Sequence, residues 1–233
     1  RDVNKPYRIT RSPMKSKSEL LCEENKLLDQ FKLRLSSNSW SSLFWKDGII
    51  DFRSYYNGNP RILYILKEAN SEENGDLRSY LRTGGQEKTW GVVARWNYAI
   101  QNNFPTWDKI INQSRESMRK DWLKIAAVIN IKKTPSVDKS DLLEISSLYK
   151  DLLHLQIEMY EPKFIICCGT SWVISKLFSA YLSGGWKCTR NGVQFSRWGK
   201  NGSYVIDFVH PQARYHSHFK HFMLTEAVRE LCN

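Results

Sequence analysis

Short runs of consecutive apolar residues alternate along the chain with stretches in which apolar residues stand three or four positions apart. The continuous runs lie at 62–66, 125–131, 164–168 and 204–209. Runs of this kind are typical of strands buried on both faces of a parallel sheet. The spaced stretches lie at 18–35, 89–102, 142–159, 171–181 and from 217 onward, and their period indicates helices. The alternation predicts a three-layer α/β/α fold with a central, mainly parallel four-stranded sheet.

Turn-forming residues divide these elements. Asn57-Gly58-Asn59-Pro60 is a clear break, so we expect a helical and irregular N-terminal extension over 1–59 that packs on an α/β domain over 60–233, together forming one unit. Residues 1–16 look like an irregular basic lead. Two Asn-Gly pairs, at 191–192 and 201–202, are typical of hairpin turns.

The polar residues that follow the predicted strands are the first candidates for a functional site. In an open α/β sheet, ligands bind beyond the carboxyl ends of the parallel strands. The residues at these exits are Glu68, Asn70, Asn130, Gly169, Thr170 and His210. We therefore expect a carboxylate, an amide and a histidine to meet at one edge of the sheet.

Charge gives the first indication of a partner. The chain carries 35 Lys and Arg against 24 Asp and Glu, a net charge of +11 that is spread along its length. A folded basic protein suits a polyanion such as nucleic acid, although a basic protein without such a partner is the alternative. No apolar run approaches the ~20 residues of a membrane-spanning helix, so no membrane association is expected.

Cysteine and histidine spacing argues against a metal or cofactor. The five cysteines include no Cys-x-x-Cys pair, which disfavours zinc and iron–sulfur sites and favours reduced thiols in a cytoplasmic protein. His216, His218 and His221 match no ligand pattern, so we interpret them as solvated or phosphate-contacting residues.

Four segments in register resemble the uracil-DNA glycosylase superfamily. Residues 128–135, in which a strand ends at Asn130 before a loop with two lysines and Pro135, resemble its centre, as does the Pro-Lys-apolar-Gly strand at 162–169. His210-Pro211 resembles its His-Pro-Ser motif, and 62–71 occupies the place of its first motif. The resemblance covers roughly residues 60–232.

The resemblance implies a metal-free, monomeric DNA glycosylase that flips a pyrimidine out of DNA and hydrolyses its N-glycosidic bond. Ala69 occupies the place of the usual Asp, and Gln212 replaces the Ser. The first motif, with Lys67-Glu68-Ala69-Asn70 and the following Gly75-Asp76-Leu77-Arg78, resembles a divergent bacterial branch, some members of which remove modified pyrimidines from phage DNA. The expected base is uracil or, in preference, a modified cytosine such as glucosylated hydroxymethylcytosine.

The resemblance also suggests roles for the candidate residues. Glu68, with Asn70 in the same loop, would stabilise the sugar cation and orient water, and His210 would donate to the leaving base. Asn130 would read the base edge beside Gly169, and Tyr80 or Trp90 would stack on the base. The residues expected to contact DNA are Lys132, Lys133, Arg214 and Tyr215.

Each role has a structural alternative. Glu68 could be a helix cap or a surface carboxylate, Asn130 a strand-end amide, and His210 a turn residue. The aromatic candidates could serve packing alone, and the lysine pair could be solvated. At the level of function, the alternatives are a catalytically inactive nucleic-acid-binding protein of the same fold and an unrelated α/β enzyme. The second is disfavoured because the sequence has neither a Gly-rich phosphate loop nor a Gly-x-Ser-x-Gly elbow.

Overall fold

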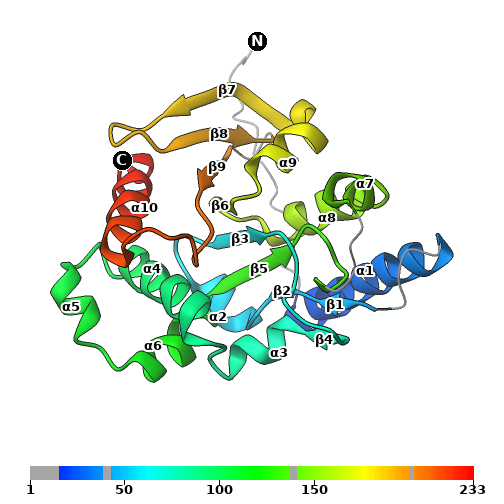
Figure 1. The fold of residues 1–233 in the computed structure, drawn as a ribbon, viewed down its shortest axis with the longest axis horizontal. Coiled ribbons are helices and arrows are strands. Elements are labelled where there is room, and N and C mark those ends of the chain that lie inside the picture. The colour runs from blue at the N-terminus through cyan, green and yellow to red at the C-terminus, as the bar shows by residue number, and fades with distance from the viewer. Residues whose placement is uncertain (1–15, 39–42, 137–140, 200–201) are drawn as a thin grey trace, which may run out of the picture.

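A seven-stranded sheet with helices on both faces forms the centre of the computed structural model, which describes residues 16–38, 43–136, 141–199 and 202–233 (Figure 1). Most of the expected basic lead and Asn201 of the second predicted turn lie outside the described residues. The strand order is β2 (Gly48–Ile49), β5 (Ala126–Asn130), β3 (Ile62–Leu66), β6 (Phe164–Cys168), β9 (Ser203–Phe208), β8 (Gln194–Trp198) and β7 (Leu182–Cys188).

The four predicted strands form the parallel centre of this sheet. β3 pairs in parallel with β5 and β6, and β6 pairs in parallel with β9. All residues of β3, β5 and β6 are buried, which agrees with their continuous apolar sequences. The fold class is therefore confirmed as α/β with a mainly parallel central sheet.

The predicted number of strands is wrong, because three antiparallel strands extend the sheet at its two edges. β2 pairs with β5, while β8 pairs with β9 and β7. β7 and β8 join around Asn191–Gly192, where a hairpin turn was predicted. β7 itself was not predicted because it is an exposed edge strand interrupted by Gly184 and Gly185, and it has no apolar run. A further two-stranded sheet pairs β1 (Trp45–Lys46) with β4 (Gly75–Asp76).

One face of the sheet is covered by helices from the middle and the end of the chain. These are α3 (Leu77–Arg82), α4 (Val92–Gln101), α5 (Trp107–Ile111), α6 (Arg115–Trp122) and α10 (Ser217–Cys232). The predicted helix at 89–102 begins as a π-helical turn, Glu87–Gly91, before α4. α4 packs against α10 (Figure 1). Trp96 of α4 stacks on Tyr64 and contacts Phe208 edge-on.

The other face is covered by helices from the N-terminal part and from the segments around β6. These are α1 (Lys17–Ser37), α2 (Phe52–Asn57), α7 (Leu142–Ser147), α8 (Lys150–Tyr160) and α9 (Ser171–Leu177). The single helix predicted over 142–159 is two helices, which separate at Leu148–Tyr149. The second part of the helix predicted over 171–181 is a 3₁₀ turn, Ser179–Tyr181. The Tyr149 hydroxyl is buried and donates to the Ile131 carbonyl, which fixes the break between α7 and α8.

α1 joins this second layer. It begins at a capping box formed by Ser16 and Glu19, and it buries Leu27, Leu28, Phe31 and Leu35 against the sheet side. These apolar residues recur every three or four positions, which explains why the sequence predicted this helix. None of the helices in the described parts of the chain is long and apolar enough to cross a membrane.

Candidate active site

The register of the parallel strands brings the predicted exit residues to one edge of the sheet. Leu66 of β3 lies opposite Asn130, and Cys168 of β6 lies opposite Phe208 of β9. Neighbouring strands lie about 4.8 Å apart, so the loops that carry Glu68 and His210, separated by β6 alone, start about 10 Å apart. The two loops are therefore neighbours at this edge of the sheet.

Glu68 is held as a charged carboxylate by two lysines. Its Oε2 lies 3.0 Å from Nζ of Lys132, which is buried, and its Oε1 lies 3.0 Å from Nζ of the exposed Lys67. Burial alone would raise the pKa of Glu68, but the hydrogen bonds and charges of the two lysines outweigh it and lower the pKa. Glu68 is therefore ionised at neutral pH.

The two lysines after β5 do not form the exposed pair that the sequence suggested. Lys133 is fully buried, and its Nζ donates to both carboxylate oxygens of Asp47 and to Gln156, each at 2.8 Å. Lys132 is also buried and is bound to Glu68. The expected contact of these lysines with DNA phosphate is corrected accordingly, because neither ammonium group reaches the surface.

Asn130 is held by its backbone, and its side chain has an unused donor. The backbone N–H donates to Asp47 Oδ2 at 2.8 Å. Within the described residues, the buried side-chain Nδ2 has no hydrogen-bond partner, and neither has the buried hydroxyl of Thr134 four positions on. An unpaired buried donor is costly, and a polar ligand atom would satisfy it.

His210 is arranged as a neutral hydrogen-bond donor. Its Nδ1 accepts the backbone N–H of Gln212 at 3.1 Å, which places the proton of the neutral ring on Nε2. Burial, together with the charge of Lys220, lowers the pKa of His210. Nζ of the buried Lys220 in turn donates to the carbonyls of Pro211 and Ala213 and holds the loop in place.

Gly169 and Thr170 close the exit of β6 between these two loops. Gly169 has φ +75°, a left-handed conformation that favours glycine, and its N–H donates to Phe208 O at 2.7 Å. The Thr170 hydroxyl donates to Ile65 O at 2.8 Å. Asn70 is exposed and accepts from the Ser136 hydroxyl at 3.4 Å, so it ties the Glu68 loop to the loop after β5.

The other candidates divide between the core and the surface. Trp90 is buried in the core cluster against Gly85, whose added Cβ would lie 2.6 Å from the indole, so it serves packing. Tyr80 is partly exposed on α3, and Arg214 and Tyr215 are exposed after the His210 loop. His218 and His221 lie against the ring of Trp107.

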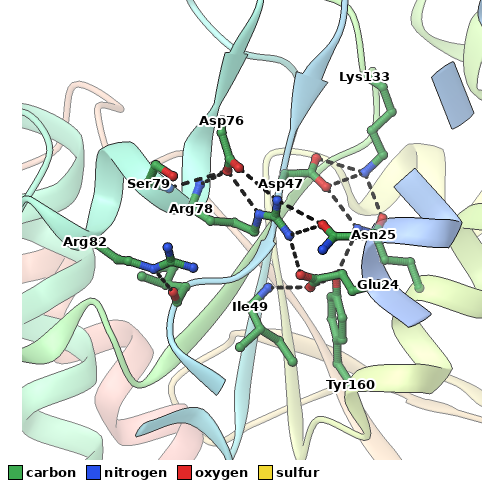
Figure 2. Close-up of polar contacts among 12 residues, drawn as sticks. Glu24, Asn25, Asp47, Ile49, Asp76, Arg78, Ser79, Arg82, Lys133 and Tyr160 are labelled. Carbon is green, nitrogen blue, oxygen red and sulfur yellow. Dashed lines mark hydrogen bonds and ion pairs between the residues drawn. The ribbon is translucent and has the colours of Figure 1, made fainter. Parts of the chain in front are cut away.

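A buried polar network, which the sequence did not predict, reaches the backbone of Asn130 through Asp47 (Figure 2 shows part of it). Asp47 joins Lys133 to the Asn130 backbone, and Gln156 links Asp47 to Tyr160. Tyr160 donates to Glu24 of α1 at 2.7 Å, and Glu24 pairs with Arg78 at 2.5 Å. Asp47 lies between two strands of two residues each, where no period marks it, so the sequence carries little signal for it.

Two cavities of about 310 Å³ lie elsewhere. One lies between α4, α5, α6 and the start of α10, and the other lies along β7, β8 and β9. Neither is lined by Glu68, Asn130 or His210.

No protein-family model matches this chain, and no curated protein matches its sequence.

Proposed function

We propose that the protein is a DNA glycosylase of the uracil-DNA glycosylase type, which hydrolyses the N-glycosidic bond of a flipped pyrimidine. The observation that carries this proposal is that an ionised carboxylate and a neutral histidine lie at the same edge of the sheet. Glu68 is kept ionised by Lys132 and Lys67, while His210 is kept neutral with its proton on Nε2. Cleavage of a glycosidic bond needs both states at once.

The chemistry follows from these two states. As the bond between C1′ and the base nitrogen breaks, its electron pair moves to the base and positive charge develops on the deoxyribose. A carboxylate stabilises this cation and orients the water whose hydroxyl is transferred to C1′, which is the role of Glu68, and the remaining proton of that water goes to the departing base. The neutral His210 donates a hydrogen bond to the base oxygen that becomes negative.

Recognition of the base is assigned to Asn130. A side-chain amide presents a donor and an acceptor together, so it can read a pyrimidine edge in two places. The unpaired, buried Nδ2 supports this role, because a flipped base would supply the acceptor that it lacks.

The likeness of the first motif to the branch that acts on phage DNA supports a modified cytosine as the preferred base and defence against phage as the setting. Ala69 follows Glu68 where a larger acidic residue would stand. The exchange removes a carboxylate from the loop and leaves Glu68 as its acidic group before Ser71.

A second candidate function is supported by one observation. Both oxygens of Glu68 are already engaged by lysines, so the carboxylate could serve structure alone. The protein would then be a DNA-binding protein of the same fold without turnover.

Abasic-site formation tests the proposal. The protein is incubated with DNA that contains uracil, hydroxymethylcytosine or glucosylated hydroxymethylcytosine, and alkali-induced strand breaks are measured. Glu68→Gln and His210→Ala should each lower excision by about 10²–10⁴-fold with DNA binding retained. Glu72→Gln, an exposed carboxylate of the same loop, is the matched control and should excise as the wild type does. Wild-type protein that binds every substrate and breaks none would favour the inactive binding protein.

A further inference from the structure

Three aromatic side chains are exposed in a row where the His210 loop enters α10. Tyr215, Phe219 and Phe222 have 57%, 53% and 50% of their surface exposed. The ring centroids of Tyr215 and Phe219 lie 6.2 Å apart, and Phe219 and Phe222 are three positions apart on one helix face. We name these three residues the aromatic face of α10. Exposed apolar groups clustered in this way mark an interaction surface.

The core does not account for the aromatic face. α10 buries its other side, with Leu224, Ala227, Val228 and Leu231, in the cluster shared with α4. The helix is therefore anchored without its three exposed rings, and they remain available to a partner.

The charges around the aromatic face suit a polyanion. The stretch 208–225 contains no Asp or Glu, and its exposed cation Arg214 lies directly before Tyr215. The next acidic residue, Glu226, is paired with Arg229 at 2.6 Å. Lys88 is exposed beside Thr89, which accepts a hydrogen bond from the Gln212 side chain, so a second cation stands near the loop.

We infer that the aromatic face of α10 binds single-stranded DNA, with unpaired bases stacked on its rings and the backbone near Arg214 and Lys88. The inference rests on the proposed function, since it takes DNA as the substrate, and deepens it by naming the form of the strand. Bases in a duplex are covered by their neighbours, and one intercalated ring fills one step. Three successive rings therefore suit a strand whose bases are free. Tyr215 stands five residues after His210, so the stacked bases are neighbours of the one excised.

Binding to unmodified DNA tests the inference without any excision. Fluorescence anisotropy measures the affinity of the wild type for a labelled thymine oligonucleotide, for the matching duplex and for a strand of equal length whose sites are abasic. The wild type should bind the thymine strand more tightly than the duplex and more tightly than the abasic strand. The variant with Tyr215→Ala, Phe219→Ala and Phe222→Ala should lose about tenfold or more in affinity for the thymine strand. Leu155→Ala, an exposed apolar residue of α8 on the other face of the sheet, is the matched control.

Equal affinity of the wild type for the thymine and abasic strands would overturn the inference, because it would show that bases are not stacked. This comparison needs no variant, so it holds even if the triple variant fails to fold. Preference for the duplex would overturn it as well. If the protein prefers the thymine strand but forms no abasic sites, the inference about the aromatic face stands and the proposed glycosylase activity fails. If the protein excises bases but does not prefer the thymine strand, the proposed activity stands and the inference about the aromatic face fails.

Discussion

At the scale of single residues, neighbouring lysines and burial set different charge states on the two sides of the candidate site. Glu68 is kept ionised by the lysines that face it, whereas His210 is kept neutral. A second histidine, His221 of α10, is held neutral more strongly. It is buried beside Trp107, and burial together with the positive charges of His218 and Arg95 lowers its pKa to about 4.

The low pKa of His221 predicts acid sensitivity. Unfolded histidine titrates near pH 6.5, so between pH 6.5 and about 4 the unfolded chain binds a proton that the folded chain does not. The free energy of unfolding should fall across this window, and His221 should contribute up to about 3 kcal/mol of the loss. Urea unfolding at several pH values should show a shallower fall for His221→Gln than for wild type. His216→Gln, an exposed neighbour, is the control, and identical slopes for the wild type and His221→Gln would refute the assignment.

At the scale of elements, buried ion pairs connect helices that lie far apart in the sequence. Arg78 of α3 bonds Glu24 of α1, whose other oxygen accepts the N–H of Ile49 in β2 at 2.9 Å (Figure 2). Burial raises the pKa of Glu24, and Arg78 opposes this effect. The position of α1 thus depends on the buried carboxylate of Glu24, whose charge is stabilised by Arg78.

Removal of one member of this pair should be severe. Arg78→Met leaves the Glu24 carboxylate buried without its cation, and we expect a loss of about 3–5 kcal/mol in the free energy of unfolding. The double variant with Glu24→Gln should recover part of that loss, because no buried charge remains. Urea unfolding of the single and double variants measures both. Arg34→Met, which breaks an exposed pair with Asp151, should cost less than about 1 kcal/mol. A double variant with losses that simply add would contradict the coupling.

Elements with a strong apolar period were predictable, and elements made by tertiary contacts were not. β3, β5 and β6 are continuous apolar runs because helices cover both of their faces. β7 has no such run because it lies at the exposed edge, and its position depends on pairing with β8. The break between α7 and α8 is set by the Tyr149 hydroxyl on the Ile131 carbonyl, a contact between segments that no helical period reveals.

The same division holds for the candidate site. Glu68, Asn130 and His210 could be selected from the sequence because parallel strands deliver their exits to one edge. Lys133 could not be assigned, because a pair of adjacent lysines looks solvated until Asp47 and Gln156 are known to surround its ammonium group. Its partner Asp47 comes from a segment with no pattern of its own.

At the scale of the whole molecule, the net charge of +11 acts as a field rather than as a set of contacts. Part of that charge is buried or internally paired, as with Lys132 and Lys133, and such cations attract DNA little. The cations that matter for binding are exposed and lie where the chain lacks carboxylates. The stretch 208–225 meets both conditions with Arg214, and Lys88 lies near it.

The salt dependence of DNA binding should separate these cations from the rest. Each phosphate contact contributes about −0.7 to the slope of log affinity against log salt for a single strand, so Lys88→Ala with Arg214→Ala should flatten the slope by about 1.4. Lys150→Ala, an exposed lysine of α8 on the opposite face of the sheet, should leave it unchanged. Removal of the aromatic face should lower affinity at every salt concentration without altering the slope, because stacking releases no counterions. A slope that survives the loss of Lys88 and Arg214 would place the DNA backbone on another surface, and α10 would then contact the bases alone.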